Sequence, residues 1–294
     1  MSSGTLVPEL SGSQIEKSFS YYETPAGEVD VEAIRNIVTN GHHEGAVVYV
    51  VRDAFSPEAA TSIVENFDRL TQRTGGGNRQ DDSYVKTHQI GATQFSYSGE
   101  EYVREVIKSS SESLELFDNV SQEELERVFL TKLLEKTFAE QGVVFRGSRY
   151  KNISGGFATL RRWLDNGEMA LHPHDDTAQL LAAVKDDYEI ATSRHVVSFN
   201  AAVQVAEEGG ELVVWNLNPD DDCRAGLGLT GTGYPYPIGT LTGLESFTVE
   251  LGPRDVYFLN ASFIHGVASV RKGQRLSAGR FIGQVADDLV VYWT

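Results

Sequence analysis

The second half of the chain is a succession of short, strand-like segments, and this feature limits the possible folds most strongly. Glycine, proline, asparagine and aspartate separate the segments. Short strands in such a succession are typical of antiparallel sandwiches and barrels, whereas parallel βαβ units alternate strands with helices. The segments are 196–205, 211–216, 246–251, 255–259, 268–271, 276–284 and 289–293. They predict a jelly roll of the cupin-like kind.

The first half of the chain carries helical patterns instead. Ser56 and Pro57 are a typical helix start, because a serine side chain caps free amides and proline fits the first turn. Ser121, with Glu124 three residues later, is a second start. Helices are predicted at 31–39, from 56 to the glycines at 75–77, at 100–117 and at 121–141, with a strand at 46–51. We therefore predict an α+β protein whose mainly helical N-terminal half packs on the jelly roll.

The domain organisation is predicted to be simple. A chain of 294 residues can bury one large core without help from disulfides or structural metals, and no linker divides it convincingly. We predict a single domain, 1–294, with a flexible lead-in over 1–30, a helical support over 31–150 and a jelly-roll core over 151–294. The stretch 218–243 is predicted to be one long loop, of the kind that often forms a substrate wall.

Charge and cysteine content exclude several function classes. The formal net charge of −17 repels phosphate backbones and anionic lipid, and no basic cluster offsets it. The single cysteine, Cys223, excludes an internal disulfide and a cysteine-rich zinc site, and we expect it to be a free surface thiol. No signal peptide or membrane helix is recognisable. We expect a cytoplasmic protein, a monomer or weak homodimer, whose partner is a small molecule rather than nucleic acid or membrane.

The most informative motif is a pair of histidines beside two aspartates. His174 and Asp176 are two residues apart, so on an extended segment their side chains point to the same side. His265 can join them from a distant strand. Two imidazoles and one carboxylate form the site of non-haem Fe(II) oxygenases. The motif alone is weak, because the same residues could be a solvated turn and a hydrogen-bonded core histidine.

Arg275 strengthens this interpretation. It stands ten residues after His265 and is followed closely by Ser277. If the neighbouring strands pair, Arg275 lies deep in the barrel near the same pocket, where a guanidinium can hold a carboxylate through two hydrogen bonds. A tight Gly209-Gly210 turn follows the strand that ends at Val205.

Together, the segment 209–212 (Gly-Gly-Glu-Leu), the His265 to Arg275 spacing and the upstream His-x-Asp resemble the iron(II)/2-oxoglutarate-dependent oxygenase superfamily over residues 155–294. The resemblance implies a double-stranded β-helix, with Fe(II), 2-oxoglutarate and O2 as cofactor and cosubstrates. It also implies that Arg275 pairs with the distal carboxylate of 2-oxoglutarate, with Ser277 as a helper. Oxidation of a substrate C–H bond would then accompany formation of succinate and CO2.

Within the superfamily, residues 158–161, 168–172 and 291–294 are similar to freestanding halogenases and hydroxylases that act on indole alkaloids. Arg161 resembles an arginine of those enzymes, which implies a role in binding cosubstrate or substrate. The halogenases carry glycine two residues after the first iron-binding histidine. Placing that histidine on His172 puts the glycine position on His174, and this chain departs from the pattern there.

Two ligand sets therefore stay open, His174 with Asp176 and His265, or His172 with His174 and His265. The first is preferred because two histidines and one carboxylate suit Fe(II). It predicts hydroxylation, or another oxidation, of an unactivated C–H bond in a small natural product or amino acid derivative. The alternatives are a halogenase with an unusual ligand set and a non-catalytic jelly-roll binding protein.

Aromatic side chains near the motifs are candidates for the substrate pocket, namely Trp215, Phe157 and Tyr150. Trp215 is the most interesting, because its strand is expected to run toward the site. Asp175 is expected to be an exposed neighbour of the metal ligands, and Gln179 a surface residue.

Overall fold

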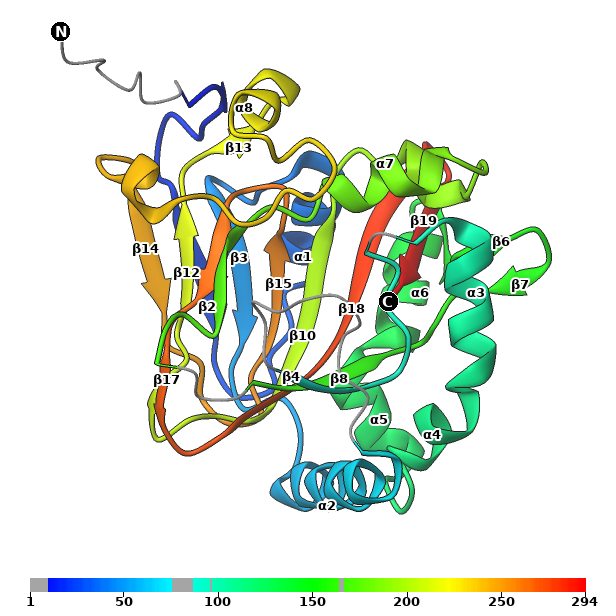
Figure 1. Ribbon diagram of the computed structural model, residues 1–294. Helices are drawn as coiled ribbons and strands as arrows, with labels where there is room; N and C mark the ends of the chain where they lie inside the picture. Colours follow the sequence, from blue (N-terminus) through cyan, green and yellow to red (C-terminus); the bar gives the residue numbers. More distant parts are fainter. Residues whose placement is uncertain (1–9, 76–86, 96, 164–166) are drawn as a thin grey trace, which may run out of the picture.

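Two β-sheets, in which most neighbouring strands are antiparallel, face each other and form a jelly roll in the computed structural model, which describes residues 10–75, 87–95, 97–163 and 167–294 (Figure 1). The large sheet has the order β2 (Ser20–Thr24), β3 (Ala46–Val51), β15 (Val256–Asn260), β10 (Val197–Gln204), β18 (Arg275–Ala286), β19 (Leu289–Trp293) and β5 (Val144–Gly147). Strand β8 (Thr159–Trp163) pairs with the Arg275 end of β18, and β4 (Thr87–Ile90) pairs with β8. The small sheet has the order β14 (Ser246–Val249), β12 (Leu212–Trp215), β16 (His265–Val267) and β9 (Leu171–His174). The predicted jelly roll is confirmed.

Three short pairs of strands complete the sheet structure. They are β1 (Gly12–Ser13) with β13 (Asn218–Pro219), β6 (Arg149–Tyr150) with β7 (Ile153–Ser154), and β11 (Glu208–Gly209) with β17 (Val270–Lys272).

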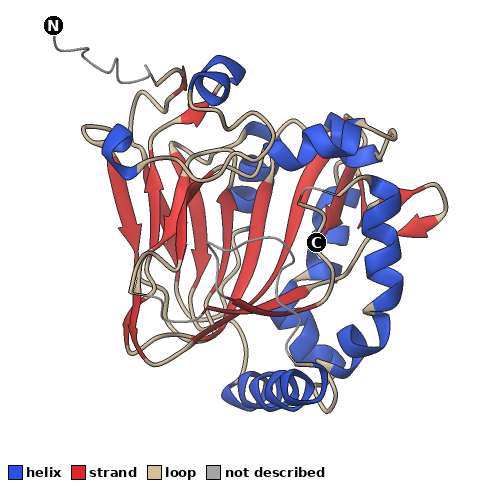
Figure 2. Ribbon diagram, viewed as in Figure 1, coloured by secondary structure: helices blue, strands red, loops and turns tan. Residues whose placement is uncertain are grey.

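The helices gather mainly beside the β19 and β5 end of the large sheet and behind it, whereas α8 lies apart near β13 (Figure 2). They are α1 (Val31–Asn40), α2 (Pro57–Thr74), α3 (Gly99–Lys108), α4 (Ser110–Glu115), α5 (Gln122–Phe129), α6 (Thr131–Ala139), α7 (Ala178–Val184) and α8 (Asp221–Gly226), with 3-10 turns η1 (Glu189–Thr192) and η2 (Ile238–Leu241). No helix among the described residues is both long enough and apolar enough to cross a membrane.

Capping explains where two of these helices begin. The Ser56 side chain accepts from the Ala59 N–H at the start of α2, and Ser121 accepts from the Glu124 N–H at the start of α5. The single helix predicted at 121–141 is wrong, because Leu130 adopts a left-handed φ of 52° and separates α5 from α6. The helix predicted at 100–117 is likewise divided into α3 and α4 at Ser109.

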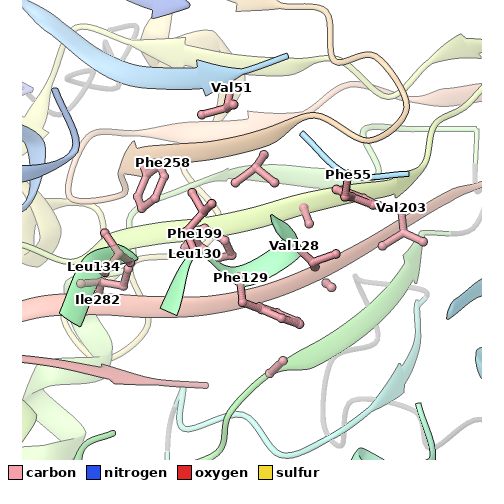
Figure 3. Packing of buried hydrophobic residues seen from close by; sticks show 14 of the residues in the cluster. Val51, Phe55, Val128, Phe129, Leu130, Leu134, Phe199, Val203, Phe258 and Ile282 are labelled. Atoms are coloured by element: carbon pink, nitrogen blue, oxygen red, sulfur yellow. The ribbon is translucent and has the colours of Figure 1, made fainter. Parts of the chain in front are cut away.

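The main hydrophobic core lies between the large sheet and the helices (Figure 3). Phe199, Phe258 and Ile282 of the sheet pack there against Phe129 and Leu134 of α5 and α6. A second cluster fills part of the space between the two sheets, where Leu259 of β15 packs with Leu212 and Val214 of β12. The large sheet is therefore covered on both faces, by helices outside and by the small sheet inside.

The predicted division of the chain into lead-in, helical support and jelly-roll core needs correction. Strands β2 and β3 both belong to the large sheet, so residues before 52 contribute to the jelly roll itself. The stretch 218–243 is also more than a loop, since it contains β13, α8 and η2. The side chain of Asp220 caps α8 by accepting from the Cys223 N–H at 2.8 Å.

Candidate active site

Neighbouring strands β9 and β16 bring the two predicted histidine ligands together. Their register sets His174 directly opposite His265. Asp176 follows β9 by two residues, and its N–H donates to the Ala261 carbonyl at 2.9 Å. The potential ligand atoms of the three side chains all lie within 4.8 Å of one another, and each side chain is buried. The fold thus assembles the three residues that the sequence pattern singled out.

Backbone carbonyls hold both histidine rings. Nδ1 of His174 lies 2.9 Å from the His172 carbonyl oxygen, and Nδ1 of His265 lies 2.9 Å from the Phe263 carbonyl oxygen. Because a carbonyl oxygen only accepts, each Nδ1 carries a proton, and Nε2 is the atom through which each ring can bind a metal. Such outer contacts orient histidines for metal binding.

The donor set fits a ferrous ion. The Asp176 oxygens lie 3.8 Å from Nε2 of His174 and 3.6 Å from Nε2 of His265. A buried carboxylate beside two neutral imidazoles is stabilised by a cation that all three share. Two imidazoles and one carboxylate suit Fe(II) and leave coordination positions for other ligands.

His172 does not join this group. Its Nε2 lies 3.4 Å from a Glu168 carboxylate oxygen, and its side chain is 22% exposed. Among the residues that the structure describes, the alternative trio of His172, His174 and His265 is therefore not assembled.

Arg275 lines the same cavity as the three predicted ligands. It is 3% exposed, its Nη2 donates to the Tyr257 hydroxyl at 3.3 Å, and its Nη1 has no hydrogen-bond partner within the described part of the chain. Burial raises the pKa of Tyr257, so this hydroxyl is neutral at physiological pH. Trp163, opposite Arg275 in the sheet register, donates from Nε1 to the Ser277 hydroxyl at 3.3 Å. A buried guanidinium with an unused N–H group beside a cavity is suited to an anion.

A second arginine also reaches the cavity. Arg161 and Arg162 are adjacent on β8 and therefore point to opposite faces. Arg161 lines the cavity and donates to the Thr93 hydroxyl at 2.9 Å. Arg162 is buried outside the cavity in an ion pair with Asp68, which is a structural role. The cavity thus contains two guanidinium groups, those of Arg161 and Arg275.

The three aromatic residues predicted near substrate lie outside this cavity. Leu212 of β12 lines the cavity, so strand alternation turns Trp215, three residues later, to the other face. Tyr150 packs in a core cluster with Tyr188, and the Phe157 ring lies against Phe129. Sequence proximity to a motif did not predict which way these rings face.

Several cavity residues were not singled out from the sequence. They include Thr93, Ser198, Asn200, Tyr234, Tyr257 and Phe281. Ser198 and Asn200 carry a usable signal, since they are polar residues two apart in a strand whose other residues, apart from the terminal Gln204, are apolar. Tyr234 carries none, because it lies in the irregular part of 218–243.

Three expectations about neighbouring residues were wrong. Asp175 is fully buried rather than exposed, because Arg224 pairs with its carboxylate. Gln179 is 2% exposed and accepts from Nε1 of Trp293 at 2.7 Å. Cys223 is buried within α8 rather than a surface thiol.

Comparisons with known proteins agree with this geometry. Residues 21–294 match the family described as carrier-protein-independent halogenase WelO5. The L-isoleucine 3(1)-dioxygenase of Pantoea ananatis (strain AJ13355) is 48% identical over 286 residues, which cover 97% of this chain and 96% of that protein.

Two solved structures are similar to this chain, and the first of them, with a TM-score above 0.5, supports a shared fold. An N-substituted L-amino acid dioxygenase from Burkholderia ambifaria AMMD has a TM-score of 0.55 at 13% identity and covers 90% of this chain and 91% of its own. HygX from Streptomyces hygroscopicus, solved with nickel and 2-oxoglutarate, has a TM-score of 0.41 at 15% identity, with 86% of each chain covered.

The family, the fold and the His-Asp-His group point to one chemistry. The cofactor is iron(II), and the cosubstrates are 2-oxoglutarate and O2. When bound, iron and 2-oxoglutarate supply the oxidising power for a substrate C–H bond, and the protein supplies binding and orientation. The chain belongs to the WelO5 family and is an iron(II)- and 2-oxoglutarate-dependent oxygenase.

Proposed function

We propose that this enzyme hydroxylates an unactivated C–H bond of a small aliphatic amino acid, with L-isoleucine as the first substrate to test. The observation that carries the proposal is the pair Arg161 and Arg275 in one cavity with His174, Asp176 and His265. Each guanidinium can hold one carboxylate. The similarity to an enzyme named for L-isoleucine supports the choice of substrate.

The charged residues of the cavity, and some of its other residues, have proposed roles. His174, Asp176 and His265 bind iron(II), and Arg275 holds the distal carboxylate of 2-oxoglutarate with help from Ser277. Arg161 then holds the carboxylate of the amino acid, because one guanidinium suffices for the distal end of the cosubstrate. Apolar side chains of Leu171, Leu212 and Val267 line the same cavity and suit an aliphatic side chain.

Hydroxylation is proposed over halogenation although the matched family is described as a halogenase. Asp176 contributes a carboxylate to the proposed iron site, at the place where the halogenases resembled by this chain have glycine. The position that such an enzyme leaves open for chloride is then filled.

The test is an assay of purified protein with Fe(II), ascorbate, 2-oxoglutarate and L-isoleucine. We expect a product heavier by one oxygen atom, succinate in equal amount, and no chlorinated product when chloride is added. A chlorinated product in the chloride arm would favour the halogenase, and failure to bind Fe(II) or to form succinate with any amino acid would favour a non-catalytic binding protein.

We also propose that residues 1–294 act as one oxygenase domain in which the helices support the jelly roll. The enzyme is proposed to be cytoplasmic and to act as a monomer or weak homodimer, without nucleic acid or membrane partners. The net charge of −17 supports the last point.

A further inference from the structure

Between the proposed ligands His174 and Asp176, the side chain of Asp175 points away from the metal group into a buried polar cluster. Nε and Nη2 of Arg224 donate to its two carboxylate oxygens at 3.1 Å and 3.0 Å. The Tyr236 hydroxyl donates to Oδ2 at 2.7 Å, and the Thr177 N–H donates to Oδ1 at 3.0 Å. Asp175 is 0% exposed, Tyr236 is 1% exposed and Arg224 is 4% exposed.

The same cluster ties the segment 221–236 to the strand that carries the metal group. Backbone hydrogen bonds run from the Asp175 N–H to the Gly233 carbonyl at 3.0 Å and from the Tyr236 N–H to the Pro173 carbonyl at 2.8 Å. Gly233 has a φ of 59°, and a Cβ there would lie 2.5 Å from the Asp175 carbonyl oxygen. Only glycine allows this close approach of the two backbones.

Tyr234 lies between these two attachment points and lines the cavity. Its ring centroid is 6.0 Å from that of His174 and 6.3 Å from that of His172. These two backbone hydrogen bonds are not part of a continuous ladder like that of a sheet, so side-chain contacts add to them in fixing the position of the segment. The buried bidentate pair of Asp175 and Arg224 is a strong and directional contact of this kind.

We propose that Tyr234 determines substrate specificity as a wall of the cavity beside His174, and that Asp175, Arg224 and Tyr236 are positioning residues that hold it there. The proposal rests on the proposed function in one respect, that the cavity receives the amino acid. It goes beyond that function because none of these four residues is a ligand of iron or of 2-oxoglutarate.

The experiment is a double-mutant cycle with Tyr236→Phe and Tyr234→Ala. Tyr236→Phe removes one hydrogen bond to Asp175 and keeps the ion pair with Arg224, so the protein keeps its fold. Hydrogen exchange of residues 227–236 should become about tenfold faster in Tyr236→Phe, with the rest of the protein unchanged. Fe(II) and 2-oxoglutarate binding, followed by anaerobic absorption spectroscopy, should remain as in the parent enzyme.

Each single variant should lower kcat/KM for L-isoleucine by about tenfold, and the double variant should be no worse than Tyr234→Ala. Tyr234→Phe, which keeps the ring, should retain most of the activity. Tyr188→Phe is the matched control: it removes a buried tyrosine hydrogen bond, to Ser148, in another core cluster. It should leave kcat/KM and the exchange of 227–236 unchanged.

Additive losses in the double variant, or unchanged exchange in Tyr236→Phe, would overturn the proposal. If the parent enzyme does not oxidise L-isoleucine, the proposed substrate fails separately. The hydrogen exchange rate of residues 227–236 then tests whether Asp175, Arg224 and Tyr236 hold this segment in place. Succinate formation without amino acid decides the role of Tyr234: it should rise about threefold in Tyr234→Ala, as water gains access to the metal group, and an unchanged rate would remove Tyr234 from the wall.

Discussion

Each face of the large sheet carries a buried arginine of β18, and the two arginines have different surroundings. Arg275 and Arg280 lie on the same strand, β18, five residues apart, and strand alternation sends them to opposite faces. Arg275 faces the cavity with an unused N–H group. Arg280 faces the helical layer, where Nη2 donates to the Phe129 carbonyl at 2.7 Å.

Aromatic rings surround the outer arginine. The Arg280 guanidinium carbon lies between 4.4 Å and 5.9 Å from the ring centroids of Phe129, Phe145, Phe157, Phe199 and Tyr292. Burial lowers the pKa of Arg280 to about 10, because removal from water disfavours the charged form. Burial of an arginine is therefore not itself a sign of function, and neither is an unpaired N–H group, since Nε and Nη1 of Arg280 also have no hydrogen-bond partner among the described residues. The two arginines differ in their surroundings, because aromatic rings enclose Arg280 whereas Arg275 lines a cavity.

The largest effect is expected from substitution of the three proposed iron ligands, which line the cavity. Replacing His174, Asp176 or His265 by alanine should abolish Fe(II) binding and succinate formation, because each supplies one ligand of a three-residue site. Metal content and succinate yield are the measurements. His172→Ala is the control and should retain iron. Loss of iron only in the His172 variant would reverse the proposed ligand set.

Arg275→Ala should raise the KM for 2-oxoglutarate by roughly 300-fold, because a buried carboxylate loses its charged partner. Succinate formation at varied 2-oxoglutarate concentration measures this. The melting temperature should change little, since the guanidinium faces a cavity. An unchanged cosubstrate dependence would remove Arg275 from the proposed role.

Arg280→Ala should have the reverse effect of Arg275→Ala: it should lower the stability of the fold and leave the KM for 2-oxoglutarate nearly unchanged. Deletion of a large, fully buried side chain from the aromatic cluster should lower the free energy of unfolding by about 3 kcal/mol. Urea unfolding measures the loss. The folded variant should keep the KM for 2-oxoglutarate within about twofold of the parent value. A large rise in that KM would show that the two faces are not separate in function.

The smallest effects should come from two tryptophans, Trp163 of β8, which lines the cavity, and Trp215 of the small sheet, which faces away from it. Trp163→Phe removes the hydrogen bond to Ser277 beside Arg275 and should raise the KM for 2-oxoglutarate by about fivefold. Trp215→Phe should change kcat/KM for the amino acid by less than about twofold, because its ring faces away from the cavity. A larger effect for Trp215 would support the role that its sequence position suggested.

Local patterns predicted much of the molecule. The strands of the second half, the starts of α2 and α5, and the pairing of His174 with Asp176 follow from alternation, capping and spacing. These signals span few residues, so they depend little on the rest of the fold. The resemblance of the motifs to the oxygenase superfamily is confirmed by the match of residues 21–294.

Other features depend on partners far away in the chain. Strands β2 and β3 join the large sheet only because β3 pairs with β15. The burial of Asp175 depends on Arg224, 49 residues later, and the direction of Trp215 depends on which face of β12 meets the cavity. Sequence alone determined which residues could perform the chemistry, since residue type and short-range geometry are local properties. Only the tertiary structure decided which of them share a cavity, because strand register and long-range ion pairs arise between segments that a linear pattern does not connect.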